Sequence, residues 1–502
     1  METITTDVLV IGAGAAGIRA ALAASETGAE VTLLAKGGVG ESGASFSHLS
    51  GGWGIQALVG RERTNKQLED FYDDIVRVGL GVCDTKLVRI LVEESGPRLE
   101  DLIRYGIRLK KDPQGNYTRV KGCFSDYKRA FIAEDVGNIR QSLLSVIRGS
   151  AVKTMKGYAL DLIIGDNACW GAWVLTEDAE IVEIKAGSTI LATGGAAGVF
   201  MNHLVSSDEV GDGYALAHRA GAELNNLEFI QFILGLKKDE RRLFLPLQDL
   251  KKPAAILDSD GRDLLEKHIP DSNIRSKAVD ERGKHFPFSC RDDSCQVDIA
   301  VARERQKGKK VFWKEGNPME QGAEVVHFSH AFNGGVKIGE RGESSVPGLF
   351  AAGEVAAGPH GADRIGGCMM TATQVFGARA GRFAALRAMK VGATSPNIRI
   401  PGGIEEILSQ RECQAQSKDL ISVKERTREI FSRHLMCLRN KNGLEFCLSK
   451  IKEADLCLKQ VKNVRGNLFL NARNTFLVMR LVASTALKRE ASLGSHYREA
   501  RQ

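Results

Sequence analysis

The beginning of the chain alternates between apolar runs and a helical pattern. Residues 8–11 form a short apolar run, residues 18–24 carry apolar side chains at helical spacing, and residues 31–34 form a second apolar run. The segment GAGAAG lies between the first run and the helix, at residues 12–17. This order predicts a strand–helix–strand unit of roughly 30 residues with a glycine-rich turn.

The glycines of this turn are typical of a site that holds a dinucleotide. Gly12 permits the tight turn, Gly14 lets the backbone approach a pyrophosphate, and Gly17 allows the helix to pack closely on the strand. The N-terminus of the helix then offers N–H donors to the phosphates. The acidic residue that normally follows the second strand is absent, because Ala35 and Lys36 stand there.

The pattern further along the chain predicts more of the same sheet. Residues 39–60 are rich in glycine and serine and predict an ordered ligand loop, and residues 65–110 predict helices. Residues 160–190 predict strands that end in a Thr-Gly-Gly segment at 193–195, which suits a second backbone approach to a cofactor. A further helix is expected to open at residues 211–213.

The second half of the chain changes character twice. Residues 223–325 are more charged and contain polar turns, which predicts an inserted second domain. Glycine is again frequent in residues 333–381. Beyond residue 403 glycine is scarce and helical spacing dominates, as in residues 470–487, which predicts a helical C-terminal domain.

Composition and charge narrow the class of protein. The chain has 502 residues, 43% hydrophobic and 26% charged, which is typical of a folded protein with several domains. Its net charge of +7 fits an anionic ligand, but no basic stripe interleaved with aromatic residues points to nucleic acid. No run of about 18 apolar residues predicts a membrane span, and no leader-like segment precedes the first strand.

The ten cysteines are dispersed, and none forms a C-x-x-C pair. Spacings typical of zinc, iron–sulfur clusters and attached haem are therefore absent, and we expect free thiols and a cytoplasmic protein. Cys290 and Cys295 flank Arg291 and are either redox-active thiols or small buried apolar residues.

Longer segments now make a family recognisable. They are ILATGG at 190–195, GDGYALAHRAGAEL at 211–224, LEFIQF at 227–232, CRDD at 290–293, HAFNGG at 330–335, GLFAAGEVAAGPHGADRIGG at 348–367 and LVASTALKREASLGSHYRE at 481–499. With the glycine-rich turn, these segments resemble the succinate dehydrogenase/fumarate reductase flavoprotein family, which includes L-aspartate oxidase and adenylylsulfate reductase α subunits. The resemblance covers nearly the whole chain.

The resemblance implies an α/β fold with three domains. A Rossmann-like FAD-binding domain would comprise residues 1–222 and 335–400, an inserted α+β capping domain residues 223–334, and a helical domain residues 401–502. The catalytic site would lie between the first two domains.

The resemblance also implies a set of FAD-binding residues. They are Gly12, Gly14, Ala15, Gly17, Lys36, Ser47, His48, Gly52, Thr193, Gly194, Asp212, Gly353, Glu354, Met369 and Met370. The Ala35-Lys36 pair is similar to the Ser-Lys pair of some members, so the missing acid does not exclude FAD. His48 lies near the position at which some members attach FAD covalently, and it either forms that bond or lines the loop.

Three catalytic residues are implied by motif position. His330 and Arg364 would bind the substrate carboxylate, for which the planar guanidinium is well suited. Arg291 would donate a proton, which its high reference pKa permits only if a hydrogen-bonded relay resupplies that proton. The alternative is that Arg291 supplies positive charge alone.

Two departures from the family pattern concern the substrate. The family continues LEFxQF with His-Pro-Thr, whereas this chain has Ile233, Leu234 and Gly235. The family segment TEGxRGEGG is replaced by PLQDLKKPA at residues 246–254, just after Leu245. A second carboxylate against apolar side chains would be poorly solvated. We therefore expect a monocarboxylate or acyl substrate with an apolar or bulky tail, rather than succinate, fumarate or aspartate.

The sequence leaves more than one function open. The first is an FAD-dependent oxidoreductase that transfers a hydride between flavin N5 and a C=C or C–C bond next to a carboxylate or acyl group. The second is a flavoprotein electron-transfer subunit of a larger redox complex with a vestigial substrate pocket. Both need an iron–sulfur or other electron-transfer partner, because the chain carries no cluster ligands. A non-enzymatic binding protein is the third.

Overall fold

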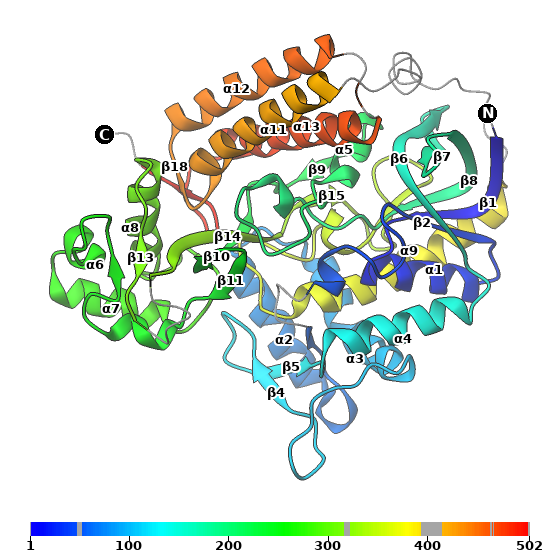
Figure 1. Cartoon of the computed structure of the whole chain (residues 1–502). Coiled ribbons are helices and arrows are strands. Elements are labelled where there is room, and N and C mark those ends of the chain that lie inside the picture. Colours follow the sequence, from blue (N-terminus) through cyan, green and yellow to red (C-terminus); the bar gives the residue numbers. More distant parts are fainter. Residues whose placement is uncertain are drawn as a thin grey trace.

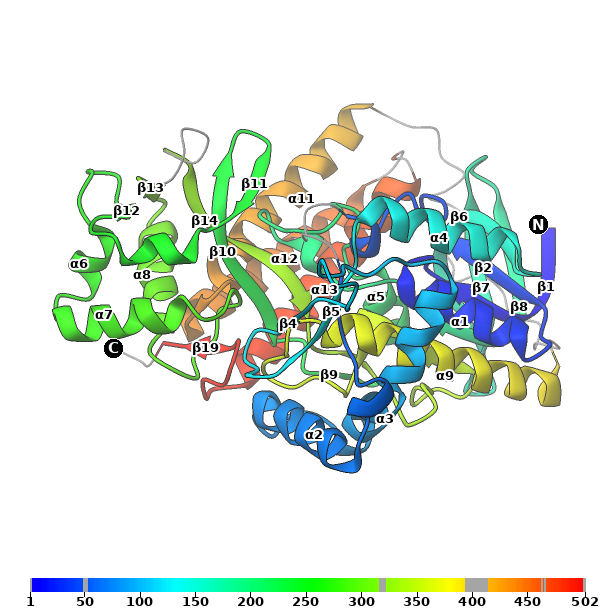
Figure 2. The ribbon, with the colours of Figure 1, turned by 90° about the horizontal axis from the view of Figure 1, so that it is seen from below.

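The structure is a computed structural model that describes residues 2–47, 53–315, 322–392, 414–461, 464 and 466–499. Two β-sheets lie at opposite ends of the molecule, and a group of long helices runs along one side (Figure 1). The view from below confirms this separation (Figure 2).

The larger sheet contains the N-terminal strand–helix–strand unit. Its strand order is β1-β2-β6-β7-β8-β16, with a further pairing of β1 to β8. The strands are β1 (Glu2–Ile11), β2 (Val31–Ala35), β6 (Lys153–Gly165), β7 (Ala168–Thr176), β8 (Ile181–Leu191) and β16 (Leu349–Ala351). Because β1, β2, β8 and β16 run parallel, their carboxyl ends meet at one edge. Ligands bind at this edge in open α/β sheets.

Two helices cover one face of this sheet in direct contact with each other. They are α1 (Ala15–Glu26) and the long α9 (Cys368–Val391). A Cβ atom at Gly381 would lie 2.1 Å from the carbonyl oxygen of Ala20, so only glycine permits this close approach. The packing joins segments from the two ends of the predicted FAD-binding domain.

A helical layer and two small sheets complete this part of the molecule. The helices are α2 (Asn65–Gly79), α3 (Thr85–Arg104), α4 (Val136–Arg148) and α5 (Asp212–Arg219). One small sheet has the order β3-β5-β4, from β3 (Gly54–Gln56), β5 (Lys128–Ile132) and β4 (Arg119–Lys121). The other has the order β17-β15-β9, from β17 (Ala356–Ala357), β15 (Gly335–Lys337) and β9 (Leu224–Asn225).

The second large sheet forms what we call the cap region, residues 230–332. It has the order β11-β10-β14-β13-β12, from β10 (Ile230–Lys238), β11 (Arg241–Phe244), β12 (Ile256–Leu257), β13 (Phe312–Trp313) and β14 (Glu324–Phe332). Its helices are α6 (Leu264–His268), α7 (Ser272–Arg282) and α8 (Cys295–Gln306). A separate apolar core around Leu236, Val301 and Trp313 stabilises it.

The helices along the side of the molecule come from the C-terminal part of the chain (Figure 1). They are α11 (Gln414–Leu435), α12 (Lys441–Gln460) and α13 (Gly466–Lys488), accompanied by the short strand pair β18 (Leu438–Arg439) and β19 (Tyr497–Arg498). Buried residues of these helices join the same core as the larger sheet.

The predicted fold class is confirmed: a Rossmann-like sheet, an α+β cap and a helical C-terminal part are all present. The predicted domain limits stay predictions, and the limit at residue 400 lies outside the described residues. Among the described helices, none is both long enough and apolar enough to cross a membrane.

Candidate functional site

A cavity of about 270 Å³ opens at the carboxyl ends of the parallel strands. Its lining comes from the first glycine-rich turn, the loop after β2, the ends of β8 and β16, and the start of α9. The predicted residues that line it are Gly12, Gly14, Ala15, Lys36, Thr193, Gly194, Asp212, Glu354, Met369 and Met370, with His330 and Arg364. The structure therefore brings together most of the predicted cofactor site and two of the three predicted catalytic residues.

The glycine-rich turn has the shape that a bound diphosphate needs. Gly12 has a φ of +107°, and a Cβ atom there would lie 2.3 Å from the carbonyl oxygen of Ala192. Helix α1 begins directly after Gly14, whose position bears no side-chain cap. The N-terminus of α1 therefore lies at the cavity, where Ser45 Oγ accepts the N–H of Ala15 at 3.1 Å, and its N–H donors suit an anion.

One wall of the cavity is a hydrogen-bonded group around Asp212. Its carboxylate accepts hydrogen bonds from Lys36 Nζ at 2.8 Å, Tyr158 Oη at 2.5 Å and Asn474 Nδ2 at 2.8 Å. Burial alone would raise the pKa of Asp212, but Lys36 and these hydrogen bonds hold that pKa below its ordinary value. Asp212 thus stays ionised and neutralises Lys36.

The other end of the cavity carries the predicted carboxylate-binding pair. Strand β14 has a register shift opposite Gln231 and Phe232, and the extra residue is His330. Such a bulge turns a side chain out of the regular alternation. Burial and the charge of Arg364 lower the pKa of His330 to about 4, so the imidazole is neutral at pH 7.

Arg364 is held by a residue that motif comparison missed. Its guanidinium donates a hydrogen bond to Gln231 Oε1, and Gln231 Nε2 donates to the carbonyl oxygen of Arg364 at 3.3 Å. Arg364 Nε and His330 Nδ1 are buried and have no hydrogen-bond partner among the described residues. Buried polar atoms of this kind normally have partners, so this end of the cavity is suited to a polar ligand.

Arg291 does not belong to the described lining of the cavity and instead binds Asp363, the residue before Arg364. Its Nε and Nη2 contact the Asp363 carboxylate at 2.9 and 2.8 Å, and Nη2 donates to the Val78 carbonyl oxygen at 2.8 Å. Asp363 also accepts a hydrogen bond from Ser289 Oγ at 2.6 Å. Burial raises the pKa of Asp363 to about 6, with Arg291 opposing that effect.

The remaining predicted FAD-binding residues are not found in the described lining of the cavity. Gly17, Ser47 and Gly353 do not belong to the described lining of the cavity. A Cβ atom at Gly17 would lie 1.8 Å from the carbonyl oxygen of Gly12, so this glycine acts by close packing. His48 and Gly52 fall outside the described residues. The roles of all these residues stay predictions.

None of the three apolar residues expected at the substrate belongs to the described lining of the cavity. Ile233 and Gln231 are two positions apart on β10 and therefore share a face. Ile233 packs with Leu204 in a small cluster. Leu234 and Leu245 belong to the core of the cap region instead, so their apolar character stabilises the cap.

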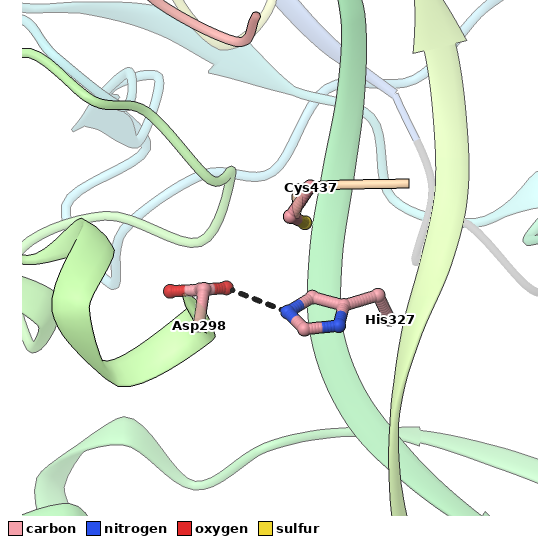
Figure 3. A group of neighbouring side chains, drawn as sticks. All are labelled: Asp298, His327 and Cys437. Carbon is pink, nitrogen blue, oxygen red and sulfur yellow. Dashed lines mark hydrogen bonds and ion pairs between the residues drawn. The ribbon is translucent and has the colours of Figure 1, made fainter. Parts of the chain in front are cut away.

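Two further groups of side chains contain cysteine. Burial raises the pKa of Cys290 to about 11 and of Cys295 to about 12, which favours inert thiols over redox-active ones. Asp298, His327 and Cys437 lie with their ligand atoms within 4.8 Å of one another (Figure 3). His327 Nε2 is 3.1 Å from Asp298.

This second group is already balanced in charge. Arg282 Nε donates to the Asp298 carboxylate at 2.6 Å, and both residues are fully buried. Burial raises the pKa of Cys437 well above its ordinary value, so its thiol stays protonated. A metal ion is therefore not needed to compensate Asp298.

The fold and the cavity define an FAD-dependent oxidoreductase. Gly12, Gly14 and the unpartnered Thr193 Oγ1 provide the space and the polar contacts that FAD requires. The family model described as "FAD binding domain" matches residues 7–370. The chain belongs to this family of FAD-dependent oxidoreductases, together with fumarate reductases and L-aspartate oxidases.

Particular relatives extend over nearly the whole chain. It is 30% identical to a fumarate reductase (CoM/CoB) subunit of Methanothermobacter marburgensis, over 99% of this chain and 95% of the relative. It is 26% identical to the L-aspartate oxidase of Streptomyces coelicolor, over 99% and 89%. A quinol fumarate reductase structure from E. coli shares the fold, with a TM-score of 0.80 and 20% identity over 100% and 92%.

Proposed function

We propose that this protein catalyses hydride transfer between flavin N5 and a C=C or C–C bond next to a carboxylate or acyl group, on a substrate other than fumarate or succinate. The observation that carries the proposal is the pair of unpartnered polar atoms at one end of the FAD cavity, Arg364 Nε and His330 Nδ1. A carboxylate or acyl oxygen placed there would accept a hydrogen bond from Arg364 Nε, and a second one from His330 in the tautomer that carries its proton on Nδ1.

The residues of this site would act in distinct ways. Arg364 and neutral His330 would orient the substrate and stabilise the negative charge that develops on its carboxylate or acyl oxygen. Gln231 would fix the guanidinium of Arg364 through Oε1, and it would hold the backbone of the same residue through Nε2. Arg291 would deliver the proton to the neighbouring carbon, and Asp363 would hold Arg291 and take part in resupplying that proton.

The apolar face of β10 supports the exclusion of a dicarboxylate. Ile233 shares the face of Gln231, two residues further along the strand. A second carboxylate at this position would lose its hydration without gaining a polar partner from Ile233. An apolar tail would instead be stabilised by burial there.

Flavin reoxidation tests this proposal. The photoreduced protein is mixed anaerobically with fumarate, crotonate or cinnamate, and the visible flavin absorbance is followed. We expect reoxidation by the monocarboxylic enoates and little by fumarate. Ile233→His should speed reoxidation by fumarate at least tenfold, whereas the matched control Ile233→Val should not. Fast reoxidation of the wild type by fumarate would contradict the proposal that fumarate is not a substrate.

A specific observation also supports an alternative function, electron transfer without substrate turnover. The guanidinium of Arg291 donates hydrogen bonds to the Asp363 carboxylate and the Val78 carbonyl oxygen, and Arg291 does not belong to the described lining of the cavity. The fumarate reductase relative is named as one subunit of its enzyme, so an iron–sulfur or other electron-transfer protein is a proposed partner here. Arg291→Ala should abolish reoxidation by enoates under the first function and leave reduction by a protein partner intact under the second.

A further inference from the structure

Two carboxyl groups contact the same glycine inside the FAD cavity. Glu209, in the loop between η4 (Ala197–Val199) and α5, accepts the Gly195 N–H at 3.2 Å through Oε1. A Cβ atom at Gly195 would lie 2.0 Å from Glu354 Oε1. Glu209 and Glu354 both line the cavity. Motif comparison had singled out Glu354 alone.

Backbone donors from separate segments of the chain hold the two side chains in place. Glu209 Oε2 accepts the N–H of Ala44, the first residue of η1 (Ala44–Phe46), at 3.1 Å. Glu354, in η6 (Gly353–Val355), accepts the N–H of Phe332 at 2.9 Å. Glu209 therefore links the loop after β2 to the segment after β8.

The charged and titratable groups around the pair do not neutralise it. Facing Glu209 or Glu354 are Asp208 in the same loop, Tyr214 on α5, Lys36 after β2 and Arg364 before α9. Lys36 is paired with Asp212, and Arg364 is bound to Gln231. Within the part of the chain that the structure describes, no lysine or arginine forms an ion pair with Glu209 or Glu354.

Two ionised carboxylates in this position would repel each other and any anionic ligand. Burial first, and then the charge of Glu354, raises the pKa of Glu209 to about 8. Burial raises the pKa of Glu354 to about 7. The pair therefore holds a proton near neutral pH. A bound FAD brings the negative charge of its diphosphate into the same cavity, which favours the protonated form further.

We propose that Glu209 is a further FAD-binding residue, which acts as a neutral carboxylic acid and donates its O–H hydrogen to an oxygen atom of the bound cofactor. Each Glu209 oxygen accepts one backbone N–H, and in the neutral acid the O–H is the one hydrogen-bond donor of the carboxyl. When Glu209 and Glu354 are both ionised, FAD binding takes up one proton from solvent. Binding therefore weakens as pH rises.

FAD titration of the full-length apoprotein between pH 6 and pH 9.5 tests this inference. Flavin fluorescence reports binding without any substrate turnover. For the wild type we expect a nearly constant Kd below pH 7 and an increase that approaches about tenfold per pH unit above pH 8. Glu209→Gln keeps a hydrogen-bond donor that cannot ionise. It should bind FAD more weakly than the wild type at pH 7, because its amide nitrogen cannot accept one of the two backbone N–H groups, and it should lose most of the increase with pH.

A control variant and a calorimetric measurement complete the test. Glu183→Gln changes an equally buried carboxyl on β8 that does not line the described cavity, and it should keep the wild-type pH profile. If Glu209→Gln fails to fold, calorimetry of the wild type in buffers of different ionisation enthalpy counts the protons taken up. Uptake of up to one proton per FAD near pH 8 supports the inference. No uptake at any pH, or an unchanged slope in Glu209→Gln, overturns it.

Discussion

Arg291 and Asp363 form an ion pair that joins the cap region to the loop carrying Arg364, with Arg291 Nη2 2.8 Å from Asp363 Oδ2. Asp363 is fully buried, whereas the side chain of Arg291 is 15% exposed. The guanidinium of Arg291 also packs over the ring of Phe124. The pair thus connects solvent to a buried carboxyl next to the predicted substrate clamp.

Asp363→Asn tests whether this pair serves proton delivery. The amide keeps the size of the side chain but no longer holds Arg291 by charge. We expect flavin reoxidation by the enoate substrate to slow by about 100-fold, and photoreduction of the flavin to be unchanged. Asp292→Asn removes a neighbouring carboxylate that does not bind Arg291 and should have little effect.

The pH profile separates this role from a merely structural one. Because burial raises the pKa of Asp363 to about 6, the carboxyl becomes protonated as pH falls below that value. The wild-type rate of reoxidation should therefore fall below about pH 6. This acid limb should be absent in Asp363→Asn. An acid limb that persists in the variant would assign it to another group.

Asp212→Ala should destabilise the apoprotein, because it removes the acceptor of three hydrogen bonds. Lys36 would be left partly buried without its closest anion, at a cost of about 3 kcal/mol in the free energy of unfolding. Urea unfolding measures this effect. The double variant that combines Asp212→Ala with Lys36→Met should recover part of this loss, because the uncompensated charge of Lys36 is then gone.

Alkylation rates test the state of the cysteines beside Arg291. Burial raises the pKa of Cys290 to about 11 and of Cys295 to about 12, so both remain thiols at pH 7.5. Iodoacetamide should label the exposed Cys457 well before either of them. Peptide mass spectrometry after timed quenching shows the order, and early labelling of Cys290 would revive the redox-active alternative.

The local motifs predict the cofactor turn well, because its geometry depends on residues close in sequence. Gly12, Gly14 and the N-terminus of α1 lie within a few positions of one another. The contacts around Asp212 were not predicted, since Tyr158 and Asn474 are 54 and 262 residues away from it. Glu209 was missed for the same reason: only the folded chain brings it to Gly195 and Ala44.

The substrate end shows a different limit of sequence comparison. Motif position predicts that both Ile233 and Leu234 lie at the substrate. It does not show that they face opposite sides, because the face of each residue depends on the register of β10. One residue along a strand reverses the face, so Leu234 enters the core of the cap region instead. The partnership of Arg291 with Asp363 likewise needs two loops that are distant in sequence.

Two predictions concern the buried group of Asp298, His327 and Cys437 (Figure 3). Arg282 and His327 both contact the Asp298 carboxylate, and they hold its pKa below the ordinary value although burial opposes them. Since Arg282 compensates Asp298, we expect EDTA to leave the thermal unfolding midpoint unchanged. Stoichiometric zinc in the purified protein, with a midpoint lowered by EDTA, would contradict this assignment.

Arg282→Met should be costly for the same reason. It leaves Asp298 buried without its arginine partner, so we expect a loss of about 3–5 kcal/mol in the free energy of unfolding at pH 7. Asp298→Asn in the Arg282→Met background should recover part of this loss. The stabilisation from Asp298 is present above its ordinary pKa of about 4 and is lost as pH falls through the lower folded value. Asp298→Asn alone should therefore flatten the acid side of the stability profile, as urea unfolding at several pH values would measure.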